Sequence, residues 1–151
     1  MIYYLAYFSK ATRLMHEEDL TYLLEESRAW NETHNLTGML VYLQGRFISQ
    51  VEGRFMQVLE GTEHDVEEIF QKIQKDPRHH QILVLKRDFI EQRYFKTWEM
   101  GFESVDIEKK HSIKGFFPID DNFLKKDIFN SSHVALDFLK SFYDTHKTFD
   151  F

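Results

Sequence analysis

The chain has 151 residues, of which 42% are apolar and 16% aromatic, and this is enough for one domain with a single core. The chain has 19 Lys and Arg and 25 Asp and Glu, and the resulting net charge of -6 disfavours a nucleic-acid partner. The absence of cysteine excludes disulfides, thiolate metal sites and cysteine nucleophiles. Because the chain has neither an apolar run of about 20 residues nor the pattern of an export signal, we expect a soluble, cytoplasmic protein without membrane contacts.

Strands and helices alternate in the first part of the predicted structure. The apolar run 2–7 predicts a strand, and residues 16–34 predict a helix because apolar positions recur at helical spacing behind three acidic residues. Residues 39–43 predict a second strand, which we expect to end at a turn formed by Gln44 and Gly45.

A near-repeat follows the second strand. The segment GRFISQVE at 45–52 is succeeded by GRFMQVLEG at 53–61. This period is far below the 20 or more residues of stacked repeats, so we interpret the repeat as a duplicated hairpin arm with one copy surplus to the sheet. We expect the extra arm, about 44–53, to project as a longer hairpin or loop and to serve as a contact surface.

The next helix and two further strands complete the predicted sheet. Thr62 and Asp65 resemble a capping box with Asp in place of Glu or Gln, and the apolar stripe behind them ends at Asp76-Pro77. Strands are predicted at 82–85 and 98–102. The order β-α-β-β-α-β(β) predicts an α+β, ferredoxin-like sheet with two helices on one face.

The C-terminal residues predict a helical cap. A short helix is expected at 122–129, and Ser131 or Ser132 could cap a last helix whose apolar side includes Ala135 and extends to His146. We expect this cap to lie across the open face of the sheet. The chain would then divide into a domain at 1–103 and a C-terminal helical extension at 104–151.

Histidines do not predict a metal site, although His34, His64, His79 and His80 could be drawn as one. Adjacent residues on a strand point to opposite faces, and no helix carries two histidines four residues apart. The chain also lacks a Gly-x-Ser-x-Gly elbow and a glycine-rich phosphate loop. An ordinary hydrolase or nucleoside-triphosphate enzyme is therefore disfavoured.

Three polar residues interrupt segments that are otherwise apolar. Tyr7 ends the first strand, Asn31 follows Trp30 in the first helix, and Gln57 lies within Phe-Met-Gln-Val-Leu. Each has an ordinary explanation when taken alone, as a core ring, a helix end or a solvent-facing strand residue. If the first and third strands are neighbours, however, all three side chains converge on one pocket.

Five motifs in order resemble a BLUF domain, the flavin-binding sensor of blue light. They are Leu-Ala-Tyr-Phe-Ser around Tyr7, Asn31 six residues before Thr37-Gly38, the segment 55–61, the segment 76–79, and Trp-Glu-Met at 98–100. The resemblance covers about residues 1–103. It implies a ferredoxin-like fold with FAD, or alternatively FMN, held noncovalently between the two helices.

The resemblance also implies roles for individual residues. Tyr7 would donate an electron to the excited flavin, and Gln57 would bridge Tyr7 to the ring. Gln50 competes for the second role, but only Gln57 is followed by Val-Leu-Glu-Gly and then directly by a helix cap. The flavin-binding residues implied are Tyr7, Asn31, Gln57, Lys72, Asp76, Arg78 and His79, and the residues implied to relay the signal are Trp98 and Met100.

The output implied by the resemblance is a contact and not a reaction. About 48 residues follow the sensor, too few for a cyclase or phosphodiesterase domain, so we expect no enzyme activity. Signalling would pass through the C-terminal helices to a separate protein or to a homo-oligomer. Two other functions remain open: a light-independent ferredoxin-like interaction module, and a small hydrolase on the same fold.

Overall fold

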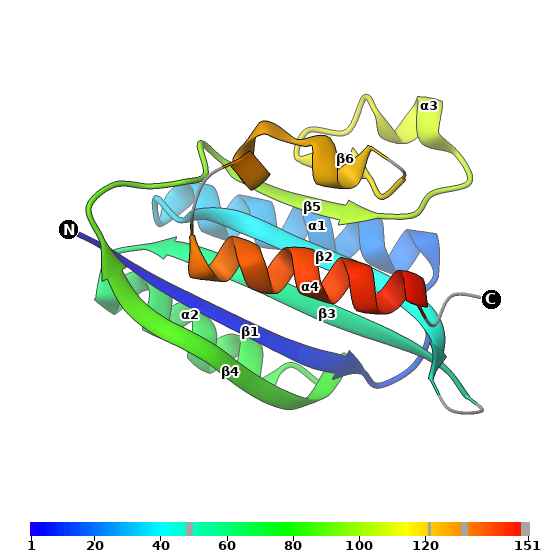
Figure 1. The fold of residues 1–151 in the computed structure, drawn as a ribbon, viewed down its shortest axis with the longest axis horizontal. Coiled ribbons are helices and arrows are strands. Elements are labelled where there is room, and N and C mark those ends of the chain that lie inside the picture. The colour runs from blue at the N-terminus through cyan, green and yellow to red at the C-terminus, as the bar shows by residue number, and fades with distance from the viewer. Residues whose placement is uncertain (48–49, 121, 131–132, 149–151) are drawn as a thin grey trace.

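The protein forms one six-stranded sheet with the strand order β4-β1-β3-β2-β5-β6 (Figure 1). The computed structural model describes residues 1–47, 50–120, 122–130 and 133–148. The order β4-β1-β3-β2 is the ferredoxin-like arrangement, so the α+β prediction is confirmed, and β5 and β6 extend the sheet in parallel beside β2. The elements are β1 (Ile2–Ala11), α1 (Glu17–Thr33), β2 (Thr37–Phe47), β3 (Gln50–Gly61), α2 (Glu63–Lys75), β4 (His79–Ile90), β5 (Trp98–Phe102), α3 (Ile107–Lys110), β6 (Phe116–Pro118), the 3-10 turns Phe123–Lys125 and Asp127–Asn130, and α4 (Val134–Thr148).

Helices cover both faces of the sheet. Figure 1 shows α4 crossing one face while α1 and α2 lie behind the other. Side chains of β1 alternate between two apolar clusters: Leu5 and Tyr7 belong to the cluster beneath α1 and α2, whereas Tyr4 and Ala6 pack with Leu139 of α4. The predicted C-terminal cap over the open face is therefore confirmed.

Side-chain bonds to the backbone define where the two long helices begin. Thr62 Oγ1 accepts a 3.1 Å hydrogen bond from the Asp65 amide at the start of α2, and its hydroxyl donates to Asp65 Oδ2 at 2.8 Å. At the start of α1 the Asp19 carboxylate accepts a 3.0 Å bond from the His16 amide. These bonds satisfy amides that lack a partner within the helix. The end of α2 at Lys75 precedes Pro77, as expected.

The arm at about 44–53 extends the β2–β3 hairpin, as expected, although no turn forms where one was predicted. The prediction of a turn at Gln44 and Gly45 is wrong, because these residues pair with Gly53 and Glu52 and the ladder continues to residues 47 and 50. Both copies of the near-repeat therefore contribute to the sheet, and neither is surplus. Within β3, residue 53 is a glycine, and a Cβ at this position would overlap the Tyr42 hydroxyl oxygen. Residues 48 and 49 lie outside the described part of the chain.

Several C-terminal details also differ from the prediction. Strand β4 continues through the charged residues 86–88 because it is an edge strand, and the short β6 was not predicted. The expected helix at 122–129 is two 3-10 turns. The predicted caps Ser131 and Ser132, and the side chain of His146, lie outside the described residues, while Ala135 is buried as expected. The boundary at residue 103 stays a prediction, although β6 beyond it pairs with β5.

None of the helices in the described ranges combines the length and the apolar character that crossing a bilayer requires.

Candidate functional site

Tyr7 and Gln57 lie opposite each other on the neighbouring strands β1 and β3. The Tyr7 hydroxyl donates a 2.7 Å hydrogen bond to Gln57 Oε1. Both residues are only 3% exposed. Burial, and then the negative charge of Asp76, raise the pKa of the Tyr7 phenol far above its ordinary value, so Tyr7 is neutral at physiological pH.

A cavity of about 290 Å³ lies beside this pair, at the lower end of the range for small-molecule sites. Its walls come from α1 and α2, and its floor comes from β1, β2 and β3. Seven of the nine residues that the resemblance implies line this cavity, and Gln50, the alternative to Gln57, is exposed near the end of the hairpin. The lining residues are Tyr7, Leu23, Glu26, Ser27, Trp30, Asn31, Leu40, Phe55, Gln57, Ile69, Lys72, Ile73, Asp76, Arg78 and His79.

Trp98 and Met100 of β5 are not among the described residues that line the cavity. Both are fully buried in the cluster beneath the helices. Met100 is nonetheless connected to the cavity by sheet register, because it pairs with Leu40 and Leu40 pairs with Gln57. The two residues on β5 share one face of their strand, so both side chains point to the same layer as the cavity.

The cavity wall contains polar atoms that the described residues do not satisfy. Asn31 is 2% exposed, yet its Oδ1 accepts no hydrogen bond from the described residues. The buried Trp30 Nε1 likewise donates no hydrogen bond to any of them. An unpaired buried polar atom costs about 1–3 kcal/mol. The pyrimidine edge of a flavin offers both N–H and carbonyl groups, so a flavin fits the unmet bonding capacity of this wall.

At the end of α2 a charged cluster faces the cavity. Arg78 Nε donates to both Asp76 oxygens, at 2.9 and 3.0 Å, and its Nη2 donates to Glu26 at 2.8 Å. Burial raises the pKa of Asp76, but the hydrogen bonds from Arg78 outweigh it and hold the pKa below the usual value. The bonds to Asp76 likewise raise the pKa of Arg78. Both residues therefore remain charged beside the cavity.

His79 is held in one tautomer by its two partners. Its Nε2 lies 2.5 Å from the carbonyl oxygen of Ile73, which can only accept, so Nε2 carries a proton. In the neutral ring Nδ1 then accepts from the Ser9 hydroxyl at 2.7 Å. His79 thus joins the end of α2 to β1 and closes one side of the cavity.

Sequence reasoning missed two residues that connect the cavity walls. The Lys72 ammonium of α2 lies 3.2 Å from the centre of the Trp30 ring of α1, and Glu26 accepts the bond from Arg78 described above. Trp30 was interpreted only as part of the apolar stripe of its helix. The available signal was spacing, since Glu26 and Trp30 are four residues apart on one helix face and Trp30 directly precedes Asn31.

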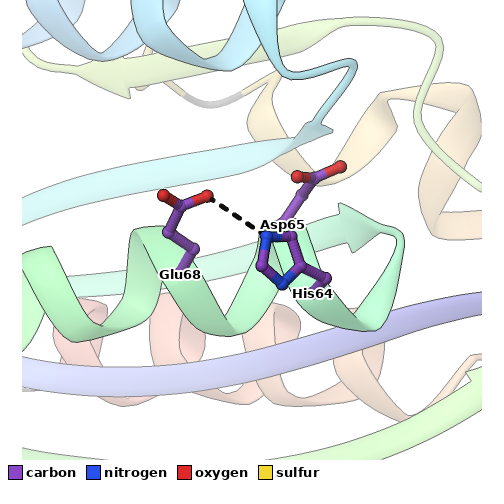
Figure 2. Close-up of side chains that lie close together, drawn as sticks. All are labelled: His64, Asp65 and Glu68. Atoms are coloured by element: carbon purple, nitrogen blue, oxygen red, sulfur yellow. Dashed lines mark ion pairs between the residues drawn. The ribbon is translucent and has the colours of Figure 1, made fainter.

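His64, Asp65 and Glu68 lie close together at the start of α2 (Figure 2). His64 is exposed and its Nε2 lies 3.8 Å from Glu68 Oε2, as drawn by the dashed line in Figure 2. Asp65 already accepts a hydrogen bond from Thr62. Asp65 is explained by capping and by the helix dipole, and Glu68 is explained as the i+4 partner of His64, so we assign this cluster no metal.

A family model described as BLUF, sensors of blue-light using FAD, matches residues 2–101. The chain belongs to the BLUF family. The family resemblance inferred from the motifs is therefore confirmed, and so is the assignment to blue-light flavin sensors. The BLUF match ends within β5, so α3, β6 and α4 lie beyond it.

Relatives of this BLUF chain include longer proteins and one of similar length. The photoactivated adenylate cyclase subunit beta of Euglena longa is 32% identical over 97 residues, which are 64% of this chain and 10% of that protein. The structure of Klebsiella pneumoniae BlrP1 with FMN and cyclic diGMP is 25% identical, with a TM-score of 0.66 over 95% of this chain and 35% of that one. The photo-activated state of BlsA is 26% identical, with a TM-score of 0.62 over 97% of this chain and 94% of that one.

The chain spans about a tenth of the length of the cyclase subunit that it matches. The alignment covers 97 residues, about the length of the BLUF match to this chain, and the rest of the cyclase subunit has no counterpart in the alignment. Residues 2–101 are accordingly a domain of the blue-light sensor family.

Proposed function

We propose that this protein senses blue light with FAD held noncovalently in the cavity between α1 and α2. The observation that carries the proposal is the buried hydrogen bond between Tyr7 and Gln57 beside a cavity whose wall leaves Asn31 Oδ1 unpaired. FMN shares the ring and the ribityl phosphate and is the alternative ligand, as in the BlrP1 structure.

Tyr7 is the proposed electron donor. A bound flavin supplies absorption of blue light and an excited state that accepts an electron. Because burial raises the pKa of Tyr7, the phenol enters the process with its proton, and oxidation makes that proton strongly acidic. Gln57 Oε1 at 2.7 Å is the atom that holds this proton in the hydrogen bond, so electron and proton transfer are coupled.

Gln57 is the proposed switch. Its amide oxygen is engaged by Tyr7, so the amide N–H groups are what it offers to a ligand in the cavity. Rotation or tautomerisation of the amide exchanges donor and acceptor, which changes the hydrogen bond at a flavin carbonyl and shifts the absorption to the red. No covalent bond to the protein is required.

The remaining lining residues hold the cofactor. Asn31 and Lys72 line the cavity, where Asn31 would pair with the pyrimidine edge of the ring and Lys72 would bond a ring carbonyl. Asp76, Arg78 and His79 would hold the ribityl side, where Arg78 would supply a permanent charge.

We propose that the signal leaves the cavity along the sheet. Successive register partners form a row from Tyr7 through Gln57, Leu40 and Met100 to Phe116 of β6. A rearrangement at Gln57 therefore reaches the C-terminal extension without crossing a loop, and Trp98 flanks the row on β5. The output is altered contact with a cytoplasmic partner protein or with a second copy of the chain, which requires a few kcal/mol of differential stabilisation.

The test uses the purified flavin-loaded protein. Blue light should shift the flavin band to the red, and darkness should restore it. Replacing Gln57→Leu should abolish the shift while the flavin stays bound, whereas the control Gln50→Leu at the exposed hairpin should keep it. A normal shift in Gln57→Leu would refute the role of Gln57, and a colourless protein after refolding with FAD would favour the light-independent interaction module.

A further inference from the structure

Arg28 lies on α1 in a position where charged residues are rare. The residue is only 8% exposed. Its Nη1 donates a 3.1 Å hydrogen bond to the backbone carbonyl of Trp98 at the start of β5, and its Nη2 donates to Glu32 Oε1 at 2.7 Å. Because a buried guanidinium is stable only while its partners stay in place, Arg28 ties the position of α1 to that of β5.

The same guanidinium is packed against the segment that leads into β6. Gly115 has a φ of +88°, and a Cβ added there would lie 3.0 Å from both Cδ and Nη1 of Arg28. The Gly115 carbonyl accepts a 2.7 Å bond from the Met100 amide, and Lys114 Nζ lies 3.5 Å from Glu32. Arg28 therefore contacts α1, β5 and the C-terminal extension at a single point.

The helix face next to Arg28 belongs to the cavity, since Asn31 is only three residues away. Ser27, which precedes Arg28, lines the cavity, and so do Trp30 and Asn31. These residues share one hydrogen-bonded helix, which moves as a unit when one of its turns is displaced. A change in how Asn31 is bonded is thus transmitted to Arg28 over about one helical turn.

We propose that Arg28 is a positioning residue that couples the cofactor cavity to the C-terminal extension through α1. The inference rests on the proposed photoreceptor function. When light alters the contacts of the ring with Asn31, α1 shifts, and Arg28 carries the shift to the Trp98 carbonyl and to Gly115. This path runs through α1 to the start of β5 and to Gly115. The row of register partners from Tyr7 to Phe116 ends beside it, so both paths lead to β6.

The experiment compares wild-type flavin-loaded protein with Arg28→Met, Arg28→Lys and the control Arg13→Met. Arg13 is an exposed arginine just before α1 that bonds Asp19 and the Leu14 carbonyl. It has no partner in β5 or β6 among the described residues, so its removal leaves the contacts of both strands unchanged. Two quantities are measured in light and in darkness: the absorption shift, and the hydrogen exchange of the backbone amides of 115–117.

The absorption shift should persist in all four proteins. The difference in exchange between light and darkness should be present in the wild type and in Arg13→Met, and should fall about fivefold or more in Arg28→Met because its hydrogen bonds are lost. Arg28→Lys should restore part of the difference, since lysine keeps the charge but not the planar fork. A wild-type exchange difference in Arg28→Met would overturn the coupling.

Glu32→Gln provides a second variant if Arg28→Met fails to fold. It weakens the Arg28 ion pair from a side chain that is 53% exposed, and we expect a smaller exchange difference, whereas an unchanged one would overturn the coupling. A wild type with the absorption shift but no exchange difference at 115–117 would overturn the coupling alone. A wild type without the absorption shift would overturn the photoreceptor proposal as well.

Discussion

The Lys72 ammonium lies 3.2 Å from the centre of the Trp30 ring and so bridges α2 to α1 across the cavity. The Trp30 ring also stacks on His34, with the ring centres 3.8 Å apart. A second bridge joins Arg78 to Glu26 at 2.8 Å, one helical turn away from Trp30. The α1 wall is thus linked once to α2 and once to the segment between α2 and β4 beside the proposed flavin site, and these links should govern how fast the cofactor leaves.

Replacing Lys72→Met should speed flavin release about 2- to 30-fold, which is the range expected for the loss of a cation–π contact. Methionine keeps an apolar stem of similar length, so the effect reports the charge. Flavin fluorescence after dilution measures the rate. Lys75→Met, on the exposed side of the same helix, is the control, and equal rates in the two variants would contradict the bridging role.

Asn31→Leu should change the flavin-free and flavin-loaded proteins in opposite directions. Without flavin, removal of the unpaired Oδ1 should raise the free energy of unfolding by about 1 kcal/mol. With flavin, loss of one hydrogen bond should weaken binding about 5- to 10-fold. Urea denaturation and a fluorescence titration measure the two effects, and the same sign in both would show that Asn31 does not serve the ligand.

Tyr7→Phe should eliminate the absorption shift because no phenol remains to donate the electron. The ring contact with Phe70 would persist, but Gln57 Oε1 would lose its donor, at a cost of about 1–3 kcal/mol in unfolding free energy. Tyr3→Phe is a matched control, since Tyr3 lies on the same face of β1 and bonds Glu67 instead. Loss of the shift in both variants would indicate a general effect of the strand.

His133 should make the docking of α4 sensitive to acid. Its Nδ1 accepts a 3.0 Å bond from the Ala135 amide, and its ring centre lies 4.7 Å from that of Tyr4 and 4.3 Å from that of Tyr94. Burial lowers the pKa of His133 below its ordinary value, and Asp137 opposes this only in part. The folded state therefore binds the proton less readily than the unfolded state does.

The sign of the pH effect follows from this difference. The contribution of His133 is complete above the unfolded pKa of about 6.5 and is lost as the pH falls toward the lower folded pKa. Urea denaturation between pH 7.5 and 5 should show a steeper loss of stability in the wild type than in His133→Asn, which keeps a capping side chain but does not titrate. Parallel curves would rule the effect out.

The core of the site could be predicted because polar interruptions are visible within single strands and the order of the elements predicts which strands are neighbours. Tyr7 and Gln57 stand out as polar residues in apolar strands, and the ferredoxin-like order places these strands side by side. The bridge from Lys72 to Trp30 could not be predicted in the same way. It depends on how far apart two helices pack, which no spacing within one helix encodes.

Boundaries were less predictable where turn residues serve other purposes. Gly45 was predicted to form a turn because glycine is common in turns, but it lies within the β2–β3 ladder opposite Glu52. Strand β4 was predicted too short because its charged side chains protect a sheet edge, and charge alone resembles a loop. β6 has three residues and ends in Pro118, so its pairing with β5 depends on tertiary contacts and not on propensity.

Strand β6 has a practical consequence for anyone who trims the protein to its sensor. Its register partners on β5 include Met100 and Gly101, and the face beneath α4 includes Met39 and Val41. Cutting the chain after residue 103 would remove both β6 and α4. The unpaired edge of β5 and the apolar sheet surface beneath α4 would then be exposed to water. Aggregation of such a truncated protein would therefore result from the truncation and would not show how the untruncated chain associates.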